Sequence, residues 1–225
     1  MPVLELTNLM KAYADGAGST RAVVDVERFV LEDHEQTALR GESGSGKTTF
    51  LNLIAGILQP DSGRISIAEE EISSRSEAQR DRFRATHIGY VFQTFNLLQG
   101  YTCLENVLLG MAFGKGANRE RATALLHRVG LSQRLHHYPR QLSTGQQQRV
   151  AVARALANQP KLVLADEPTG NLDHANAREV LKLIRDTCRE NGAAFLLVSH
   201  DREVLAEFER VEDFHELNKA FQPQK

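Results

Sequence analysis

The chain has 225 residues, enough for one large domain with a sizeable hydrophobic core. Its formal net charge is -2, so its overall field favours neither nucleic acid nor a membrane surface. The two cysteines, Cys103 and Cys188, are far apart and in no metal-ligand spacing, which argues against a disulfide framework and suits a reducing compartment.

Neither a signal peptide nor a membrane-spanning helix is predicted. Residues 1–5 lack a basic region followed by an apolar stretch. The longest apolar runs, such as residues 162–165 and 193–198, have the length of a strand, whereas a spanning helix needs roughly 20 residues. If the protein works at a membrane, another chain is expected to cross it.

The N-terminal part of the chain is predicted to be mainly strands. Alternation and β-branched content predict strands over residues 3–9 and 22–30, with turn residues at 15–19 between them. A short strand over residues 37–40 leads into a glycine-rich loop, and residues 64–68 form another short strand.

The glycine-rich loop matches the pattern G-x-x-x-x-G-K-[ST], which cradles a nucleoside triphosphate such as ATP or GTP. Its glycines let successive backbone N–H groups turn toward phosphate oxygens. Lys47 is expected to reach the β- and γ-phosphates, and the Thr48 hydroxyl to bind Mg²⁺. Residues 49–55 predict a helix whose positive N-terminal end faces the phosphates. The predicted nucleotide contacts in this loop are Gly41, Glu42, Ser43, Gly44, Ser45, Gly46, Lys47, Thr48 and Thr49.

The middle of the chain changes character. Residues 77–84 predict a polar helix, and residues 88–92 predict a strand that ends at Gln93. The pattern then becomes mostly helical, and we interpret residues from about 95 to 155 as a helical subdomain inserted into an α/β core.

Two later segments predict parallel strands. Residues 161–165 and 194–199 are continuous apolar runs, typical of strands covered on both faces, and a helix over residues 175–190 connects them as a βαβ unit. The first strand ends in Asp166 and Glu167. Acids often mark a strand end, but downstream of a phosphate loop Asp166 can hold Mg²⁺ and Glu167 can polarise the attacking water.

The segment Leu142-Ser143-Thr144-Gly145-Gln146-Gln147-Gln148-Arg149 resembles the signature of ATP-binding-cassette (ABC) ATPases, usually Leu-Ser-Gly-Gly-Gln. Other motifs follow in the family's order, so the resemblance covers nearly the whole chain. It implies an α/β fold with a P-loop NTPase core, an antiparallel β-subdomain and the inserted helical subdomain, all within a single domain over residues 1–225.

The resemblance also implies roles for residues outside the phosphate loop. Tyr13 would stack on adenine, and Gln93 would sense Mg²⁺ and the attacking water. Asp173 would lie in the loop that contacts a partner cassette, and His200 would contact the γ-phosphate. Glu167 would act as the general base, with Lys47, Gln93 and His200 completing the catalytic set.

The signature implies a homodimer across the ATP sites. Ser143 can cap the helix that begins near Thr144, which leaves free N–H groups and a positive dipole end. In the family two cassettes pack head to tail, and the signature of one, here Ser143, Gly145 and Gln146, closes on the γ-phosphate bound by the other. The implied cofactors are ATP and Mg²⁺. The implied metal contacts are Thr48, Gln93 and Asp166.

Residues 91–98, 105–107, 146–156 and 165–173 resemble one branch of the family, the ATPases of lipoprotein-release, macrolide-efflux and cell-division complexes. The branch implies a transmembrane permease as partner, and a peripheral position on the cytoplasmic face of the inner membrane. Membrane contact would run only through the permease. Cargo and direction of transport are not readable from this chain.

An alternative is a soluble ABC ATPase acting on ribosomes or DNA. The chain lacks the coiled coil, zinc module or second cassette of such proteins, and its near-neutral charge lacks a basic stripe, so no nucleic acid is expected. A P-loop kinase or GTPase would not need the signature together with Gln93 and His200.

Several positions leave alternatives open. Thr144 stands where the family usually has glycine, and Arg40 is charged where an apolar residue is expected, so it snorkels or pairs with an acid. Residues 210–218 lack the usual Asp-Gly turn, so the last strands are shortened or replaced by a helix. Phe95, Leu97 and Leu98 form either core of the helical lobe or part of a groove for the permease. His136 and His137 favour a loop over a metal site.

Overall fold

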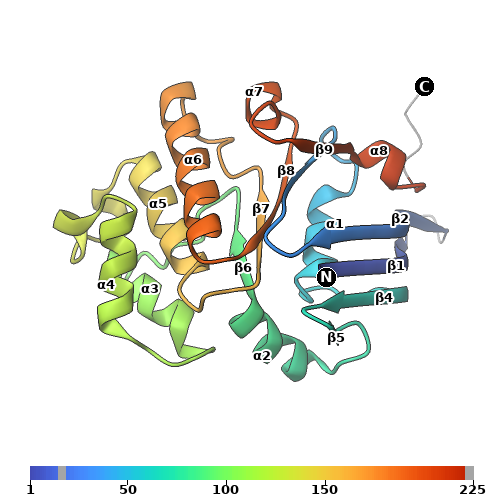
Figure 1. Ribbon diagram of the computed structural model, residues 1–225, viewed down its shortest axis with the longest axis horizontal. Helices are drawn as coiled ribbons and strands as arrows, with labels where there is room; N and C mark the ends of the chain where they lie inside the picture. The colour runs from blue at the N-terminus through green and yellow to red at the C-terminus, as the bar shows by residue number, and fades with distance from the viewer. Residues whose placement is uncertain (15–18, 221–225) are drawn as a thin grey trace.

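Two sheets and their covering helices make up the computed structural model, which describes residues 1–14 and 19–220. The turn predicted at residues 15–19 lies outside the described residues except for Ser19. The antiparallel sheet has the order β2-β1-β4-β5, and the parallel sheet has the order β6-β7-β8-β3-β9 (Figure 1). This arrangement, an antiparallel β-subdomain beside a P-loop α/β core, confirms the predicted fold class.

The antiparallel sheet is built on a long hairpin. Its strands are β1 (Pro2–Ala14), β2 (Thr20–Glu32), β4 (Ser62–Ile67) and β5 (Glu70–Glu71). β1 and β2 are each 13 residues long and exceed the predicted ranges, because they pair with each other from Pro2↔Glu32 to Ala14↔Thr20. Cross-strand hydrogen bonding therefore extends the strands past the apolar alternation that predicts them.

The parallel sheet carries the strand ends that matter for function. Its strands are β6 (Ile88–Val91), β7 (Leu162–Asp166), β8 (Ala194–Ser199), β3 (Gln36–Arg40) and β9 (Arg210–Asp213). Alternate residues of β7 and β8 enter two different cores. Leu162 and Leu164 join the core toward the antiparallel sheet, whereas Val163 and Ala165 join the core on the opposite face. Burial on both faces explains their uninterrupted apolar sequence.

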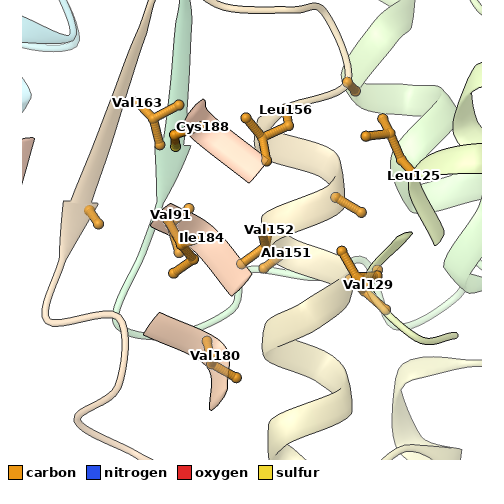
Figure 2. Close-up of a cluster of buried hydrophobic side chains, with 14 of the residues drawn as sticks. Val91, Leu125, Val129, Ala151, Val152, Leu156, Val163, Val180, Ile184 and Cys188 are labelled. Atoms are coloured by element: carbon orange, nitrogen blue, oxygen red, sulfur yellow. The ribbon is translucent and has the colours of Figure 1, made fainter. Parts of the chain in front are cut away.

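Helices cover both faces of this sheet. α1 (Lys47–Ile54) lies between the two sheets and buries Phe50, Leu51, Leu53 and Ile54 there. On the opposite face, α6 (His174–Glu190) places Cys188 beside Val163 of β7, and Ile184 between Val91 of β6 and Val152 of α5 (Thr144–Ala155), as Figure 2 shows. The remaining helices are α2 (Glu77–His87), α3 (Cys103–Ala112), α4 (Arg119–Arg128), α7 (Arg202–Leu205) and α8 (Phe214–Leu217), with 3-10 turns at Ser132–Arg134 and Pro139–Gln141.

The C-terminal segment ends the parallel sheet without a β-hairpin. β9 has four residues and pairs in parallel with β3, and α8 follows at once, with the Asp213 carboxylate accepting from the His215 N–H at 2.9 Å. Asp213 also accepts from the guanidinium of Arg40 at 2.5 Å, and this contact holds the pKa of Asp213 below its usual range. Arg40 therefore pairs with an acid, and the C-terminus has both a shortened strand and a helix.

Both cysteines are expected to resist thiol reagents in the folded protein. Cys103 and Cys188 are fully buried, and burial raises the pKa of the Cys103 thiol to about 11 and that of Cys188 to about 12. At pH 8 a thiol with such a pKa is at most about 0.1% thiolate. We expect no labelling by a chromogenic disulfide reagent in native buffer and two labelled thiols in denaturant. Rapid labelling of the native protein would contradict the packing of α3 and α6.

Candidate functional site

The loop between β3 and α1 adopts backbone conformations that require glycine. Gly44 and Gly46 have φ angles of +80° and +97°. A Cβ at Gly46 would lie 2.6 Å from the Val23 carbonyl oxygen of β2, so no other residue fits there without moving that strand. Gly46 is also the N-cap of α1, so the positive end of this helix opens at the loop.

Lys47 lies at the base of this loop. Its side chain is buried, and its ammonium donates to the carbonyl oxygens of Gly41 and Glu42, each at 2.7 Å. Burial lowers the pKa of Lys47, while the nearby carboxylates of Glu167, Asp166 and Glu42 act in the opposite direction. The site thus holds the Lys47 ammonium close to the carboxylates of Asp166 and Glu167, where little water reaches them.

Asp166 ends β7 and faces α1. The residue is 8% exposed, and its carboxylate hydrogen-bonds with the hydroxyl of Thr48. Burial raises the pKa of Asp166, and the neighbouring Glu167 raises it further, while the Thr48 hydroxyl and Lys47 lower it. A hydroxyl and a carboxylate in contact form part of the oxygen donor set that Mg²⁺ prefers.

Glu167 is held by the end of the neighbouring strand. Its Oε2 accepts from the Ser199 hydroxyl at 2.9 Å, and its Oε1 accepts from the His200 backbone N–H at 3.1 Å. The His200 Nδ1 lies 2.7 Å from the same Oε1. Glu167 also has a φ of +44°, which side-chain-bearing residues rarely adopt. The backbone turn, together with the three contacts from Ser199 and His200 at the end of β8, fixes the orientation of this carboxylate.

A cavity of about 300 Å³ opens above the loop. It brings together ten predicted site residues: Ser43, Gly44, Gly46, Lys47, Thr48, Thr49, Gln93, Asp166, Glu167 and His200. Val23 of β2 also lines it, which the sequence analysis missed, because only the pairing of distant strands brings that side chain to the loop. Gln93 follows β6, and its carbonyl accepts from the Asn171 side chain at 2.8 Å.

Four other predicted residues do not line this cavity. Gly41 and Glu42 face a neighbouring cavity beside Arg40, and Ser45 is buried beneath the loop. Tyr13 is 43% exposed on β1, opposite Arg21 of β2. The Lys11 ammonium lies 5.7 Å from the Tyr13 ring centroid, so this exposed ring has a cation beside it.

The signature residues lie outside the cavity of their own chain. Ser143 is the N-cap of α5: its hydroxyl accepts from the Gln146 N–H at 3.3 Å, and the Gln146 side chain accepts from the Ser143 N–H at 3.1 Å. Asp173 caps α6 in the same way through the Asn176 N–H at 3.0 Å. A Cβ at Gly145 would lie 3.2 Å from the Asn176 side-chain oxygen, so the starts of the two helices adjoin.

The site fits a nucleotide with Mg²⁺ better than a protein-only metal centre. Among residues 1–14 and 19–220, no group of three or more His, Cys, Asp or Glu side chains could hold a metal ion, His136 and His137 included. Mg²⁺ in proteins commonly takes one or two carboxylates plus substrate phosphates and waters. The buried Ser45 hydroxyl has no hydrogen-bond partner in the described part of the chain, and it does not line the cavity above the loop.

The parallel sheet, the glycine-rich loop capping α1 and the carboxylates at the end of β7 define a P-loop nucleotide-binding protein. The ABC transporter family model matches residues 25–170. The chain belongs to the ABC transporter family, as an ATP-binding ATPase cassette.

Relatives and solved structures agree with this assignment. The chain is 45% identical to the lipoprotein-releasing system ATP-binding protein LolD of Pseudomonas syringae pv. tomato, covering 93% of each chain. It is 47% identical to the macrolide export ATP-binding/permease protein MacB of Rhodopirellula baltica, covering 93% of this chain and 31% of that protein.

Among solved structures, a dimeric ATP-binding cassette in a post-hydrolysis state, bound to ADP and Pi, superposes with a TM-score of 0.86 at 34% identity. That superposition covers 98% of this chain and 97% of the other. In the described ranges, with residues 15–18 and 221–225 left aside, no helix is both long and apolar enough to cross a bilayer.

Proposed function

We propose that the chain is the Mg²⁺-dependent, ATP-hydrolysing subunit of a lipoprotein-release or macrolide-export type of transporter, working on a separate transmembrane permease. One observation carries this proposal: Lys47, Asp166 and the Glu167–His200 pair share one cavity, whereas the signature helix of the same chain lies outside it. The complex would place the protein peripherally on the cytoplasmic face of the inner membrane.

In the proposed reaction, water attacks the γ-phosphorus in line with the leaving ADP oxygen. Glu167 accepts a proton from that water, and the His200 and Ser199 contacts hold its carboxylate in place. Lys47 and the loop N–H groups bind the phosphate oxygens, and Gln93 orients the water. Thr48, Asp166 and Gln93 would hold Mg²⁺, which when bound would supply positive charge to offset that of the phosphates.

The active form is proposed to be a head-to-tail homodimer. Ser143, Gly145 and Gln146 start a helix whose positive end meets no phosphate within its own chain, and Asp173 lies next to that helix start. A second copy would supply this end to the γ-phosphate, so ATP would join the subunits and hydrolysis would release them. Residues 1–225 would form one cassette, with the helical subdomain of about residues 95–155 carrying the signature.

A second cavity, of about 530 Å³, is proposed to bind a short cytoplasmic helix of the permease. This permease groove lies between α2, β6, α3 and α5, and its apolar lining includes Tyr90, Phe92 and Phe113. Phe113 is 72% exposed. Arg82 lines the groove and favours a helix with both apolar and acidic residues, whereas Arg84 pairs with Asp81 of the same lining at 2.6 Å.

The groove and the nucleotide cavity meet at consecutive residues, since Phe92 lines the first and Gln93 lines the second. Movement of a permease helix in the groove would therefore displace Phe92 and, through it, the water-orienting residue Gln93. Of the three apolar residues left open above, Leu97 is buried and Phe95 packs against the same core, whereas Leu98 is exposed. None of the three lines the groove, which their neighbour Asn96 does.

The test is to tag the protein, solubilise host membranes gently and identify what co-purifies. A stoichiometric multi-pass protein with a large extracytoplasmic domain is the expected partner. Recovery of ribosomes or DNA without a membrane protein would overturn the proposal and leave only the ATPase.

If the permease binds in the groove, a substitution in the groove should reduce the amount of permease that co-purifies. Phe113→Asp is expected to reduce permease recovery at least about tenfold, because it puts a charge on an exposed apolar contact, while ATP binding stays unchanged. Val211→Asp is the matched control, since Val211 is an exposed apolar residue on the distant edge strand β9. Equal recovery for both variants would place the permease elsewhere.

A further inference from the structure

The atypical C-terminal segment passes beside the phosphate-binding loop and carries a buried side-chain amide. Asn218 is fully buried, and its side-chain nitrogen donates to the carbonyl oxygens of Val23 at 2.9 Å and Ser45 at 3.1 Å. Its side-chain oxygen accepts from the backbone N–H groups of Asp25 at 2.8 Å and Ala220 at 3.3 Å. One side chain therefore joins strand β2, the loop and the C-terminal segment.

The bond to Ser45 bears on how the loop presents its N–H groups. In a trans peptide the C=O and the following N–H point in opposite directions. Holding the Ser45 carbonyl on Asn218 therefore turns the Gly46 N–H away from the C-terminal segment, and Gly46 lines the nucleotide cavity. Gly46 has a φ of +97°, and as a glycine it could also adopt other backbone angles if the hydrogen bond to Asn218 were absent. Asn218 selects the one that faces phosphate.

A second contact from the same segment supports the rest of the loop. Phe214 is fully buried, and its ring centroid lies 5.2 Å from that of Phe50 on α1. A Cβ at Gly41 would lie 3.3 Å from the Phe214 Cβ, so this residue also packs against the start of the loop. The Lys219 N–H donates to the Asp25 carbonyl at 2.8 Å, which fastens the end of the segment to β2. We name residues 214–219 the C-terminal clamp.

We propose that Asn218 is a positioning residue for ATP binding, holding the Ser45–Gly46 peptide in its phosphate-facing orientation from the C-terminal clamp. The proposal rests on the nucleotide-binding role of the loop proposed above. The proposal assigns a function to the atypical C-terminal segment, which lacks a glycine turn. This segment supplies the side-chain amide of Asn218, and the phosphate-binding loop itself has no such amide.

The test compares Asn218→Ala with the wild-type chain, using equilibrium binding of a fluorescent ATP analogue with Mg²⁺ and steady-state hydrolysis. Losing the hydrogen bonds donated to the Ser45 carbonyl of the loop and the Val23 carbonyl of β2 is expected to raise both the dissociation constant and KM about tenfold. The kcat at saturating ATP is expected to stay within about twofold, because Asn218 does not touch the reacting atoms. The backbone N–H resonance of Gly46 in the full chain should shift.

Asn218→Asp provides the second variant. Its carboxylate can still accept from the Asp25 N–H but faces the Val23 and Ser45 carbonyls with negative charge, so it should raise KM at least as much. If the alanine variant does not fold, this variant supplies the same measurements.

Lys219→Ala is the matched control. It removes an exposed side chain from the same clamp and leaves the backbone bond to Asp25 intact, so wild-type KM is expected. A folded Asn218 variant with unchanged KM and an unchanged Gly46 resonance would overturn the proposal. Tight binding by Lys47→Ala would instead refute the role of the loop itself, so the two failures are distinguishable.

Discussion

Glu167→Gln is expected to lower ATP turnover about a thousandfold while leaving ATP bound. The amide has nearly the shape of the carboxylate, and its oxygen can still accept from the His200 N–H, but it cannot take a proton from water. ATP joining two subunits would then persist, so the variant should form a stable dimer with Mg²⁺-ATP. Single-turnover hydrolysis and light scattering after size exclusion measure both effects.

The control for this variant is Glu203→Gln. Glu203 is an exposed carboxylate on α7 that pairs with Arg178, and it lies outside the nucleotide cavity. Its loss should leave turnover and the monomer–dimer balance at wild-type values. Turnover near wild-type for Glu167→Gln would remove Glu167 from the role of general base.

Lys47→Ala is expected to weaken ATP binding at least about a hundredfold, because a buried ammonium facing the phosphates contributes strongly in a poorly solvated site. The same change leaves the carbonyl oxygens of Gly41 and Glu42 without the donor they share. A small fall in thermal stability should therefore accompany the loss of binding. Titration with a fluorescent ATP analogue and a melting curve of the apo protein separate the two effects.

Lys182→Ala serves as the control, since Lys182 is exposed on α6 and far along the chain from the loop. Its ATP affinity should match the wild type. Retention of tight ATP binding by Lys47→Ala would contradict the assigned role of the loop, whatever its effect on stability.

The elements that could be predicted are those whose cause is local in the sequence. Apolar runs predict β7 and β8 nearly to the residue, because a parallel strand covered on both faces admits few polar side chains. The glycine pattern around Lys47 predicts the loop, since glycine adopts the positive φ angles found at Gly44 and Gly46 without the strain that a side chain brings. The length of β1 and β2 could not be predicted so well, because it depends on partner strands.

Within the site, the same division holds. The sequence alone determined the chemical groups: a lysine in a phosphate loop, two acids after a strand and a histidine after the next strand. Only the tertiary structure decided that Ser199 and His200 both hold Glu167, that Val23 lines the cavity, and that Arg40 meets Asp213. Each of these contacts joins segments that are distant in the chain, so no local pattern encodes them.

The C-terminus marks the limit most clearly. Its lack of glycine predicted a departure from the family's last strands, and nothing in the sequence pointed from Asn218 to Ser45, 173 positions earlier. Strand β9 pairs with β3, the strand that leads into the loop. The segment after β9 then meets β2 at the bridge between Asn218 and Val26. A buried amide must satisfy its hydrogen bonds with whatever the fold places around it, so the partners of Asn218 were set by packing and not by sequence position.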